Sequence, residues 1–533
     1  MRILIFHGYL LGGTGSNVYN ARLAAALVAL GHEVHLLCQD RHADEQPFVD
    51  AVGDWDSGEL RVREIGREAV SGIDGEVVSG VECEELAGVG RGEVRCTVYR
   101  PDIGSLLPVY VADRYEGVRA RTFAECSDTE VASYIEANVA AVRDVCARVR
   151  PDVALANHLV MGPVILARAL AGEVSYAVKV HGSALEYTVK PHPERFLGPA
   201  REGLADARAV LVGSHHTAAS LWGTIEDPTL EERTRLGPPG VDVARFLPRD
   251  SQSAAEGLRA LTVRLRSSSS TDVAGGTAAS AFARDEHAAA GALERLDPDR
   301  ERPVVFVGKL IVNKGVDLLL ASWPLVLQSV SNAMLVVVGF GADRTLLERL
   351  LGAFAQEDLQ AAEAIALPHL LAFLQGMDDD ARAHYVEAAR ALSERVVFTG
   401  RLDHGELVDL LPACEAMVVP SMFPEAFGMV AAEAAACGVL PISAAHSGLA
   451  EVSRALADAV PREVGPLLSF PVDDRPVVAL AARVVAWLRI DPLVRERTRA
   501  GLVSTVRERW SWEGVARGVI AAARGELDGL SEP

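Results

Sequence analysis

Two glutamates, Glu425 and Glu433, are the only charged residues in the stretch 420–434, where an apolar strand and a turn lead into an Ala-rich helix. If this helix begins near Phe427, a rise of about 1.5 Å per residue separates the two acids by roughly 12 Å along the chain. The unpaired N–H groups of the first helical turn lie between them, and helix N-termini favour phosphate. The pattern suits a ligand with polar groups at both ends and an anionic centre, as in a sugar nucleotide.

A simpler interpretation is that neither glutamate has a function. A glutamate before a helix is often only a cap, and one eight residues later is often solvated. However, Glu433 lies in the apolar run 429–437, where burying an unpaired acid would be costly. This context favours the functional interpretation.

The segment resembles the element of two glutamates separated by seven residues in retaining glycosyltransferases of the GT-B fold, family 4 type, also called glycosyl transferases group 1. Glu425 and Glu433 match the two acids, and Ala426 stands where that family usually has proline. The resemblance implies an α/β protein with two doubly wound Rossmann-like domains that face each other across a donor-binding cleft. It implies that Glu425 holds hydroxyls of the donor sugar and Glu433 the ribose. The start of the helix would supply further donor contacts, chiefly backbone amides facing the diphosphate, at Phe427, Gly428, Met429 and Val430.

The elements that must position these groups begin at the N-terminus. The pattern predicts a buried strand, a Gly-rich loop, a helix and a second strand over residues 2–7, 8–16, 17–30 and 33–38. This order is a βαβ unit, which indicates a parallel sheet.

The Gly-rich loop lets the backbone approach a phosphate closely. Gly12 and Gly13 match a glycine pair that in the family lies against the donor phosphates and near the acceptor. A dinucleotide-binding domain is the alternative, because Asp40 after the second strand could contact a ribose. Its fingerprint is incomplete, however, since the third glycine position is occupied by Val18.

His181 follows a predicted strand over 175–180, at the carboxyl end where open α/β sheets place ligands. A lone histidine is more often a structural hydrogen-bonding group, and His158, His215 and His216 are interpreted in that way. The segment at His181 resembles the family's His-Gly element, which implies a place beside the donor sugar. The alternation of helices and strands over 128–212 predicts a doubly wound first domain.

A second α/β pattern begins with a predicted strand over 303–308, followed by a turn with Lys309 and Lys314. Lysines are usually solvated, but this turn resembles the family's Arg-Leu-x-x-x-Lys-Gly turn, whose cations grip the donor diphosphate. Lys309 replaces the arginine, so the charge is kept and the planar fork is lost. Arg401 and Leu402 follow another strand, at an end that the family uses for the nucleotide base.

These patterns divide the chain into four parts. We predict an N-terminal, acceptor-side Rossmann-like domain over 1–246 and a C-terminal nucleotide-sugar domain over 302–507. Between them, much of 247–301 is predicted to be a flexible low-complexity insertion because of its Ser, Ala and Gly content, although a helix over 286–296 could form within it. A C-terminal helix within 508–533 is expected to cross back onto the first domain. The stretches 41–100 and 353–393 are elaborations without an assigned role.

Composition excludes several classes of protein. A length of 533 residues favours two domains, and a net charge of −21 excludes nucleic acid as the main partner. The same charge disfavours stable docking on anionic lipid, although peripheral membrane contact through a local basic patch stays open. The seven scattered cysteines lack a C-x-x-C pair and predict reduced thiols in the cytoplasm. The sequence begins directly with a strand pattern, which argues against a signal peptide, and no apolar run is long enough for a membrane span.

The predicted function is transfer of a sugar from a nucleotide-sugar donor to the hydroxyl of an unknown acceptor, a sugar, glycan or small molecule. The resemblance implies retention at the anomeric carbon, with His181, Lys314 and Glu425 as the catalytic residues. No metal or other cofactor is expected. A sugar-nucleotide epimerase, a phosphorylase and a non-catalytic sugar-nucleotide-binding regulator are the alternatives. The donor base, its sugar, the acceptor and the oligomeric state are left open.

Overall fold

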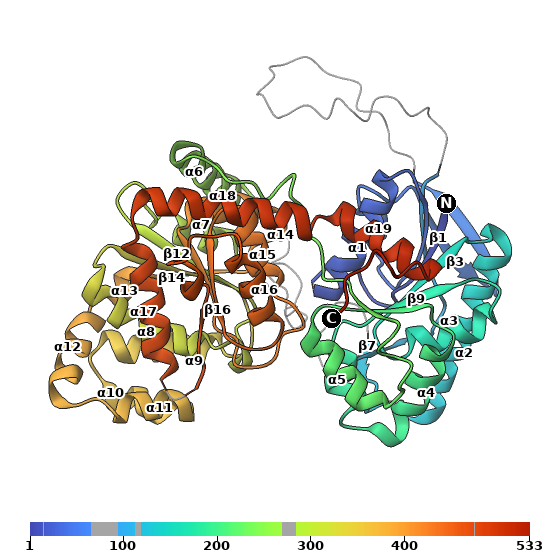
Figure 1. Cartoon of the computed structure of the whole chain (residues 1–533), viewed down its shortest axis with the longest axis horizontal. Helices are drawn as coiled ribbons and strands as arrows, with labels where there is room; N and C mark the ends of the chain where they lie inside the picture. The colour runs from blue at the N-terminus through green and yellow to red at the C-terminus, as the bar shows by residue number, and fades with distance from the viewer. Residues whose placement is uncertain (14, 66–93, 112–118, 269–283, 474) are drawn as a thin grey trace, which may run out of the picture.

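The computed structural model describes residues 1–13, 15–65, 94–111, 119–268, 284–473 and 475–533. They form two lobes, each built around a parallel sheet with helices on both faces (Figure 1). The predicted α/β architecture of two doubly wound domains is confirmed.

Within the described residues, the sheet of the first lobe has the order β11-β10-β9-β8-β1-β2-β5-β3-β4 and is parallel except for the pair β3 and β4. Its strands are β1 (Arg2–Phe6), β2 (Glu33–Leu37), β3 (Ala51–Asp56), β4 (Glu59–Glu64), β5 (Cys96–Arg100), β8 (Val153–Asn157), β9 (Tyr176–Lys179), β10 (Ala209–Val212) and β11 (Thr234–Leu236). A second small sheet pairs β6 (Leu106–Val109) with β7 (Arg119–Thr122). The stretch 41–100, which had no predicted place, therefore extends the sheet at one edge through β3, β4 and β5; its residues 66–93 lie outside the described part.

Side chains alternate between the two faces of this sheet, as the period of a strand requires. Ile3 and Ile5 of β1 pack into one apolar core, and Leu4 and Phe6 pack into the other. One face is covered by α1 (Gly15–Ala29) and α19 (Trp512–Arg524). The helices of the other face are α2 (Asp128–Val149), α3 (Gly162–Leu170), α4 (Pro193–Ala205) and α5 (His215–Ile225).

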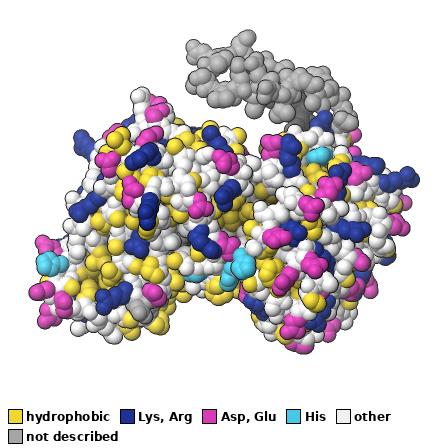
Figure 2. Space-filling model, viewed as in Figure 1, with side chains coloured by type: hydrophobic (Ala, Val, Ile, Leu, Met, Phe, Trp, Pro, Cys, Tyr) yellow, Lys and Arg dark blue, Asp and Glu magenta, His cyan; other side chains and the backbone are white. Residues whose placement is uncertain are grey.

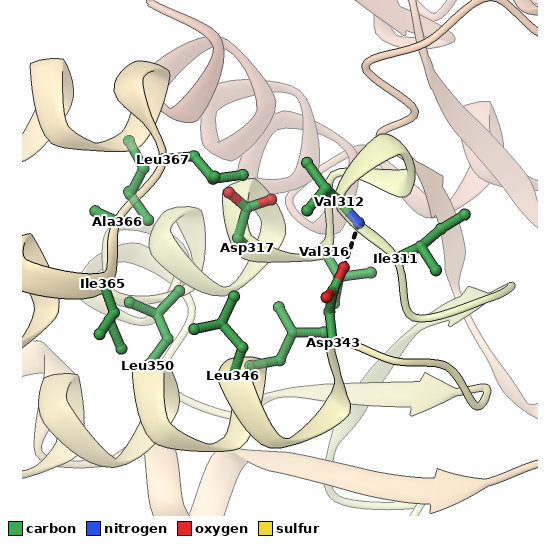
Figure 3. A pocket seen from close by; sticks show the side chains of 12 residues that line it. Ile311, Val312, Val316, Asp317, Asp343, Leu346, Leu350, Ile365, Ala366 and Leu367 are labelled. Carbon is green, nitrogen blue, oxygen red and sulfur yellow. Dashed lines mark hydrogen bonds between the residues drawn. The ribbon is translucent and has the colours of Figure 1, made fainter.

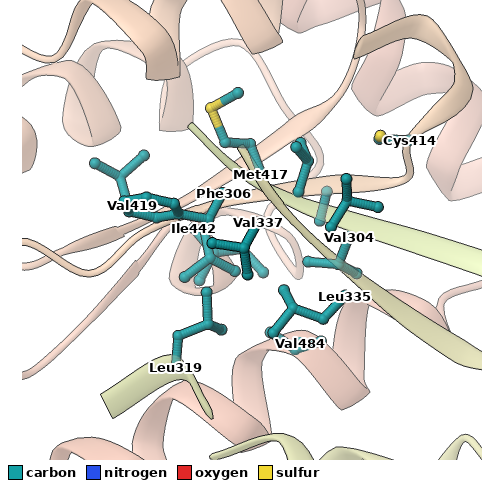
Figure 4. Close-up of a cluster of buried hydrophobic side chains, with 14 of the residues drawn as sticks. Val304, Phe306, Leu319, Leu335, Val337, Cys414, Met417, Val419, Ile442 and Val484 are labelled. Carbon is teal, nitrogen blue, oxygen red and sulfur yellow. The ribbon is translucent and has the colours of Figure 1, made fainter. Parts of the chain in front are cut away.

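The described sheet of the second lobe is wholly parallel, in the order β14-β13-β12-β15-β16-β17. Its strands are β12 (Arg302–Val307), β13 (Ala333–Val338), β14 (Val396–Gly400), β15 (Ala416–Val419), β16 (Leu440–Ala444) and β17 (Ser469–Phe470). Its helices include α8 (Val316–Ser329), α14 (His404–Leu410), α15 (Met429–Ala436), α16 (Ser447–Ala457), α17 (Pro476–Leu488) and α18 (Pro492–Arg509). Figure 4 shows the apolar core between sheet and helices, where Phe306, Val337 and Ile442 of three strands meet Leu319 of α8 and Val484 of α17.

The stretch 353–393, an elaboration without an assigned role, is mainly helical. It contains the end of α9 (Arg344–Ala355), then α10 (Leu359–Ile365), α11 (Pro368–Gln375) and α12 (Asp379–Ala389), and reaches into α13 (Leu392–Arg395). Tyr385 of α12 is fully buried, and its hydroxyl donates to the carbonyl of Ala321 in α8 at 2.9 Å. The insertion is thus anchored to the second lobe.

The two ends of the 247–301 segment, which was predicted to be largely flexible, are helical, and the second helix falls in the range 286–296 where a helix was expected. Helix α6 (Ser251–Ser267) and helix α7 (Glu286–Leu293) pack against each other and against the second lobe, with Leu258, Leu261 and Leu293 buried in its core. The low-complexity signal came from the centre, whose residues 269–283 lie outside the described part. The apolar residues of 251–267 recur on one helical face, and docking of that face supplies the stability that composition did not predict.

Two chain segments cross side by side between the lobes. The N–H of Val241 donates to the carbonyl of Trp510 at 2.6 Å, and Val241 pairs with Ser511. After this crossing α19 lies on the first lobe, where Trp512 joins the core (Figure 1). A Cβ at Gly240 would collide with the Trp512 ring, so this crossing requires glycine.

Candidate functional site

The carboxyl ends of both sheets face each other where the lobes meet. Parallel strands carry their carboxyl ends at one edge, and open α/β sheets place ligands there. The position of a Cβ on Gly182 of the first lobe lies 3.5 Å from Cβ of Ala426 in the second, and that on Gly15 lies 3.9 Å from Sδ of Met429. Loops at the strand ends of the two lobes therefore contact each other directly.

Glu425 lies in the turn after β15, which ends at Val419, and several groups fix its position. Its carboxylate contacts Nζ of Lys314 and accepts a hydrogen bond from Oγ of Ser421 at 2.6 Å. Its backbone N–H donates to Oγ of Ser447 at 2.9 Å. Burial raises the pKa of this carboxyl, but Lys314, Ser421 and His446 outweigh burial, so the pKa lies below its ordinary value. Glu425 is therefore an ionised acceptor at neutral pH.

The helix after Glu425 begins at Met429, two residues later than predicted, and Gly428 precedes it. Phe427 is outside the helix, and its ring packs edge-on against Trp510 with centroids 5.3 Å apart. The side chain of Phe427 belongs to the core, so only its backbone is left for a ligand. Met429 and Val430 are partly exposed in the first turn of the helix.

Glu433 is 3% exposed and lies on α15 among alanines. Its Oε1 is 2.6 Å from Nε2 of His404, the first residue of α14. His404 in turn packs against Phe246, with ring centroids 5.1 Å apart. His404 had no predicted role, yet it is the group that allows this acid to be buried.

The cationic turn follows β12. Lys314 ends a short 3-10 turn over Val312–Lys314, and Gly315 takes the left-handed conformation with φ of 65°. A Cβ at Gly315 would collide with the carbonyl oxygen of Pro420, so glycine brings the turn against the loop of Glu425. The N–H of Met422 in that loop donates to the carbonyl of Asn313 at 2.9 Å. These contacts place Lys314 beside Glu425.

A pocket lies next to the cationic turn, and Ile311, Val312 and Val316 contribute to its lining (Figure 3). Oδ2 of Asp343 accepts from the N–H of Val312 at 2.6 Å, which ties the turn to the start of α9. The rest of the lining is mainly aliphatic, with Ile311 and Leu346 among the residues that Figure 3 labels. The turn is therefore held by the hydrogen bond to Asp343 and lies next to an aliphatic pocket.

Two other predicted residues follow β12 and β14, the strands on either side of β13 in the second lobe. Lys309 follows β12 and is partly exposed. Arg401 follows β14, donates to Oδ1 of Asp403 at 3.0 Å and lies over the ring of Phe340. Leu402 is 8% exposed, so its side chain belongs to the core and its backbone alone could contact a base.

His181 belongs to a buried polar cluster of the first lobe. Its Nε2 is 2.8 Å from Oδ1 of Asn157 at the end of β8, and its ring lies edge-on to Tyr19. Burial, with smaller contributions from His158, Lys179 and His7, holds the pKa of His181 well below its ordinary value. His181 is therefore uncharged at neutral pH. The predicted Gly12 and Gly13 lie in the exposed loop before α1.

The lobes also contact each other through an ion–amide contact and an aromatic pair. The carboxylate of Glu451 in α16 accepts from the backbone N–H groups of His215 and His216, at 2.8 and 3.0 Å. These amides open α5, so the acid lies at a helix N-terminus of the opposite lobe, where negative charge is favoured. Tyr187 and Phe423, one from each lobe, stack with centroids 6.0 Å apart.

Sequence reasoning missed the groups that hold the predicted residues in place, among them Ser421 and Asn157. Asn157 ends β8 and Ser421 lies two residues after β15, so a rule that collects every polar residue near strand ends would have found them. His404 and Glu451 carry no such signal, because their partners are distant in sequence.

Acidic and basic side chains are interspersed over the described surface on the face that Figure 2 shows. Among the described residues no cluster of three or more His, Cys, Asp or Glu could hold a metal ion. None of the described helices has the length and apolar character to cross a bilayer.

Two family models match the chain. Residues 14–224 match the Glycosyl transferase 4-like domain, and residues 294–460 match Glycosyl transferases group 1. Together the two matches span more than two thirds of the sequence. They fall on the first and second lobes, respectively.

Curated relatives are similar over part of the chain. A D-inositol 3-phosphate glycosyltransferase from Segniliparus rotundus is 29% identical over 249 residues, 46% of this chain and 45% of the relative. A GDP-mannose-dependent monoacylated alpha-(1-6)-phosphatidylinositol monomannoside mannosyltransferase from Corynebacterium glutamicum is 26% identical over 211 residues, 38% of this chain and 42% of the relative. The matched part of this chain thus spans less than half the length of these relatives.

Solved structures share the fold over nearly the whole chain. Sucrose-phosphate synthase from Thermosynechococcus elongatus has a TM-score of 0.55 at 18% identity, covering 99% of both chains. HepE from Anabaena, solved in complex with UDP and glucose, has a TM-score of 0.53 at 14% identity, covering 99% of this chain and 100% of that one. The two family matches, one on each lobe, indicate a group 1 glycosyltransferase, and the paired parallel sheets with the likeness to these solved structures show the GT-B fold.

Proposed function

We propose that the protein transfers a sugar from a nucleoside-diphosphate sugar to an acceptor hydroxyl, with retention at the anomeric carbon. The observation that carries the proposal is the contact between Lys314 and Glu425 at the facing strand ends. It places a cation and an ionised acceptor side by side, directly before the N-terminus of α15. A donor has the matching order of groups, with an anionic diphosphate joined to a ring of hydroxyls.

In the proposed reaction the glycosidic C–O bond of the donor breaks and the diphosphate leaves with the bonding electron pair. Lys309, Lys314 and the amides that open α15 stabilise the charge on this leaving group. The acceptor oxygen forms the new bond on the same face of the sugar, and its proton passes to the departing phosphate oxygen. This balance needs no protein nucleophile, and we propose that the reaction proceeds without a metal or another cofactor.

The remaining site residues bind and orient the donor in this proposal. Glu425 accepts hydrogen bonds from sugar hydroxyls on one side, and His181 contacts the sugar on the other. Glu433 binds the ribose, and the backbone after β14 contacts the base. The loop with Gly12 and Gly13 approaches the phosphates from the first lobe.

A cytoplasmic location is also part of the proposal. The six cysteines within the described residues are all free thiols, and five of them are buried. Free thiols persist in reducing compartments.

Product analysis tests the proposal. The protein is incubated with UDP-glucose or GDP-mannose and a panel of hydroxyl acceptors, and release of the nucleoside diphosphate is followed. NMR coupling constants of the product then report the anomeric configuration. A new glycoside with the configuration of the donor is the expected result.

Two variants sharpen the experiment. Glu425→Gln keeps the size of the side chain and removes its charge, so turnover should fall by about 100-fold or more. Glu202→Gln is the matched control, because Glu202 pairs with Arg168 on the surface of the first lobe. An epimerised donor, a sugar phosphate or a product of inverted configuration would each contradict the proposal, as would binding without turnover across the whole panel.

A further inference from the structure

A continuous chain of buried polar side chains joins the Gly-rich loop to His181. Nδ2 of Asn17 donates to the carbonyl of Gly12 at 2.7 Å, and Oδ1 of Asn17 is 3.0 Å from Nε2 of His7. Nδ1 of His7 is 3.0 Å from Nδ2 of Asn20, whose two protons are shared among this nitrogen, the carbonyl of Ser16 at 2.9 Å and Oδ1 of Asn157 at 3.1 Å. The path ends at His181, whose Nε2 is 2.8 Å from the same Oδ1.

The partners of His7 determine which atoms donate and which accept in the first half of this path of hydrogen bonds. Its Nε2 faces two acceptors at 3.0 Å, the carbonyl of Leu10 and Oδ1 of Asn17, so Nε2 must carry the proton. Its Nδ1 then accepts from Asn20. Burial lowers the pKa of His7 to about 4, which keeps the ring in this neutral form.

The orientation of Asn157 determines the second half. Its Nδ2 donates to the carbonyl of Phe6 at 3.2 Å, so its Oδ1 must be the atom that faces Asn20 and His181. Asn157 is 1% exposed and has no room to turn toward water. An amide oxygen can only accept, and Nε2 of His181 therefore carries the ring proton.

We propose that Asn157 is a positioning residue that holds His181 in the Nε2–H tautomer and so leaves Nδ1 as an acceptor for a hydroxyl of the donor sugar. Nδ1 makes no hydrogen bond within the described part of the chain. The same path of polar contacts leads from this ring through Asn20 and His7 to the carbonyl of Gly12 in the Gly-rich loop. The catalytic consequence rests on the proposed function, whereas the tautomer is a property of the free protein.

Loss of the hydrogen-bond partner that orients a functional histidine typically lowers activity by about 10- to 100-fold. Asn157→Ala should lower turnover with UDP-glucose or GDP-mannose by that factor. Asn157→Asp should be more informative. Its carboxylate still accepts from Nε2, but its charge favours the imidazolium of His181, which has lost the Nδ1 lone pair. The acid limb of kcat/KM should therefore move to higher pH in this variant.

NMR of protein labelled with ¹⁵N-histidine reads the tautomer directly, with His181→Gln to assign the signal. We expect His181 as Nε2–H at pH 7 in the wild type, a mixture of tautomers in Asn157→Ala, and a raised pKa in Asn157→Asp. Asn138→Ala is the matched control, since Asn138 is equally buried in the first lobe and donates only to the carbonyl of Tyr134 within α2. It should change neither the His181 signal nor the pH profile. Thermal melts of all variants identify any that lose the fold.

An Nδ1–H or charged His181 in the wild type would overturn the proposal. So would an Asn157→Asp enzyme whose His181 pKa rises while its pH profile stays in place. A protein that consumes no nucleotide sugar but shows the expected change of tautomer would refute the proposed glycosyl transfer and leave the positioning by Asn157 supported.

Discussion

Replacing Lys314 by methionine removes one positive charge while keeping much of the side-chain volume. Two effects should follow, one on the departing diphosphate and one on Glu425. Loss of a preorganised electrostatic group costs about 100- to 1000-fold in turnover, or roughly 2.7–4 kcal/mol of barrier. The Lys314 side chain is 30% exposed, so water screens part of its field and we expect a loss near 100-fold.

The loss should fall mainly on kcat. The diphosphate is already charged in the bound donor, but further charge develops on it as the glycosidic bond breaks, and only that difference accelerates the reaction. Initial rates with UDP-glucose and GDP-mannose give kcat, and calorimetric titration gives the donor Kd. Lys314→Arg keeps the charge and should recover part of the activity.

The second effect concerns stability and its dependence on pH. In the wild type the pKa of Glu425 is depressed, because Lys314 and its other partners outweigh burial. The stabilisation is present above the unfolded pKa and is lost as the pH falls through the folded pKa, below about 4.5. In Lys314→Met burial dominates and the pKa rises, so Glu425 destabilises the variant at neutral pH, and this cost disappears in acid. The stability difference between wild type and variant should therefore be larger at pH 7 than at pH 4.

Lys190→Met is the matched control. Lys190 forms an exposed pair with Glu186 four residues earlier, and such pairs contribute about 0.3–0.5 kcal/mol. Turnover should be unchanged in this variant. If Lys314→Met retained turnover near that of the wild type, or if its stability difference did not depend on pH, the assigned role of the Lys314 and Glu425 pair would be refuted.

Three further predictions test other parts of the molecule. Leu261→Ala should lower the free energy of unfolding in urea by about 2–5 kcal/mol, because Leu261 of α6 is fully buried, whereas a negligible change would restore the flexible-insertion hypothesis. Burial lowers the pKa of Lys179 to about 7, so the folded protein holds fewer protons than the unfolded chain above that pH. Wild type should then gain stability relative to Lys179→Met by up to about 1.4 kcal/mol per pH unit between pH 7 and 10, and a difference that does not vary with pH would contradict this. Glu451→Gln weakens an acceptor at a helix N-terminus by about 0.3–1 kcal/mol, which should increase the average radius of gyration in small-angle X-ray scattering as the lobes separate. An unchanged radius of gyration would show that the Glu451 contact does not hold the lobes together.

Much of the architecture could be predicted from local sequence, because its physical causes are local. Short apolar runs that alternate with helical segments mark the buried parallel strands. Gly315 is needed where the backbone must take a left-handed conformation against Pro420. The two lysines of the second-lobe turn are half of the four lysines in the chain. The spacing from Glu425 to Glu433 likewise depends only on one turn and one helix. For these reasons the fold class and the site segments were predicted without a structure.

The partners of these residues were decided only by the tertiary structure. The pairing of Glu433 with His404 joins two helices, and the bonds from His215 and His216 to Glu451 join two lobes. No local pattern reports such distances, since each depends on how whole elements pack. The 251–267 segment shows the same limit, because it adjoins the low-complexity centre of the insertion and only docking of its apolar face makes it part of the core. The sequence alone thus determines which groups can do chemistry, and packing determines their charge, tautomer and orientation.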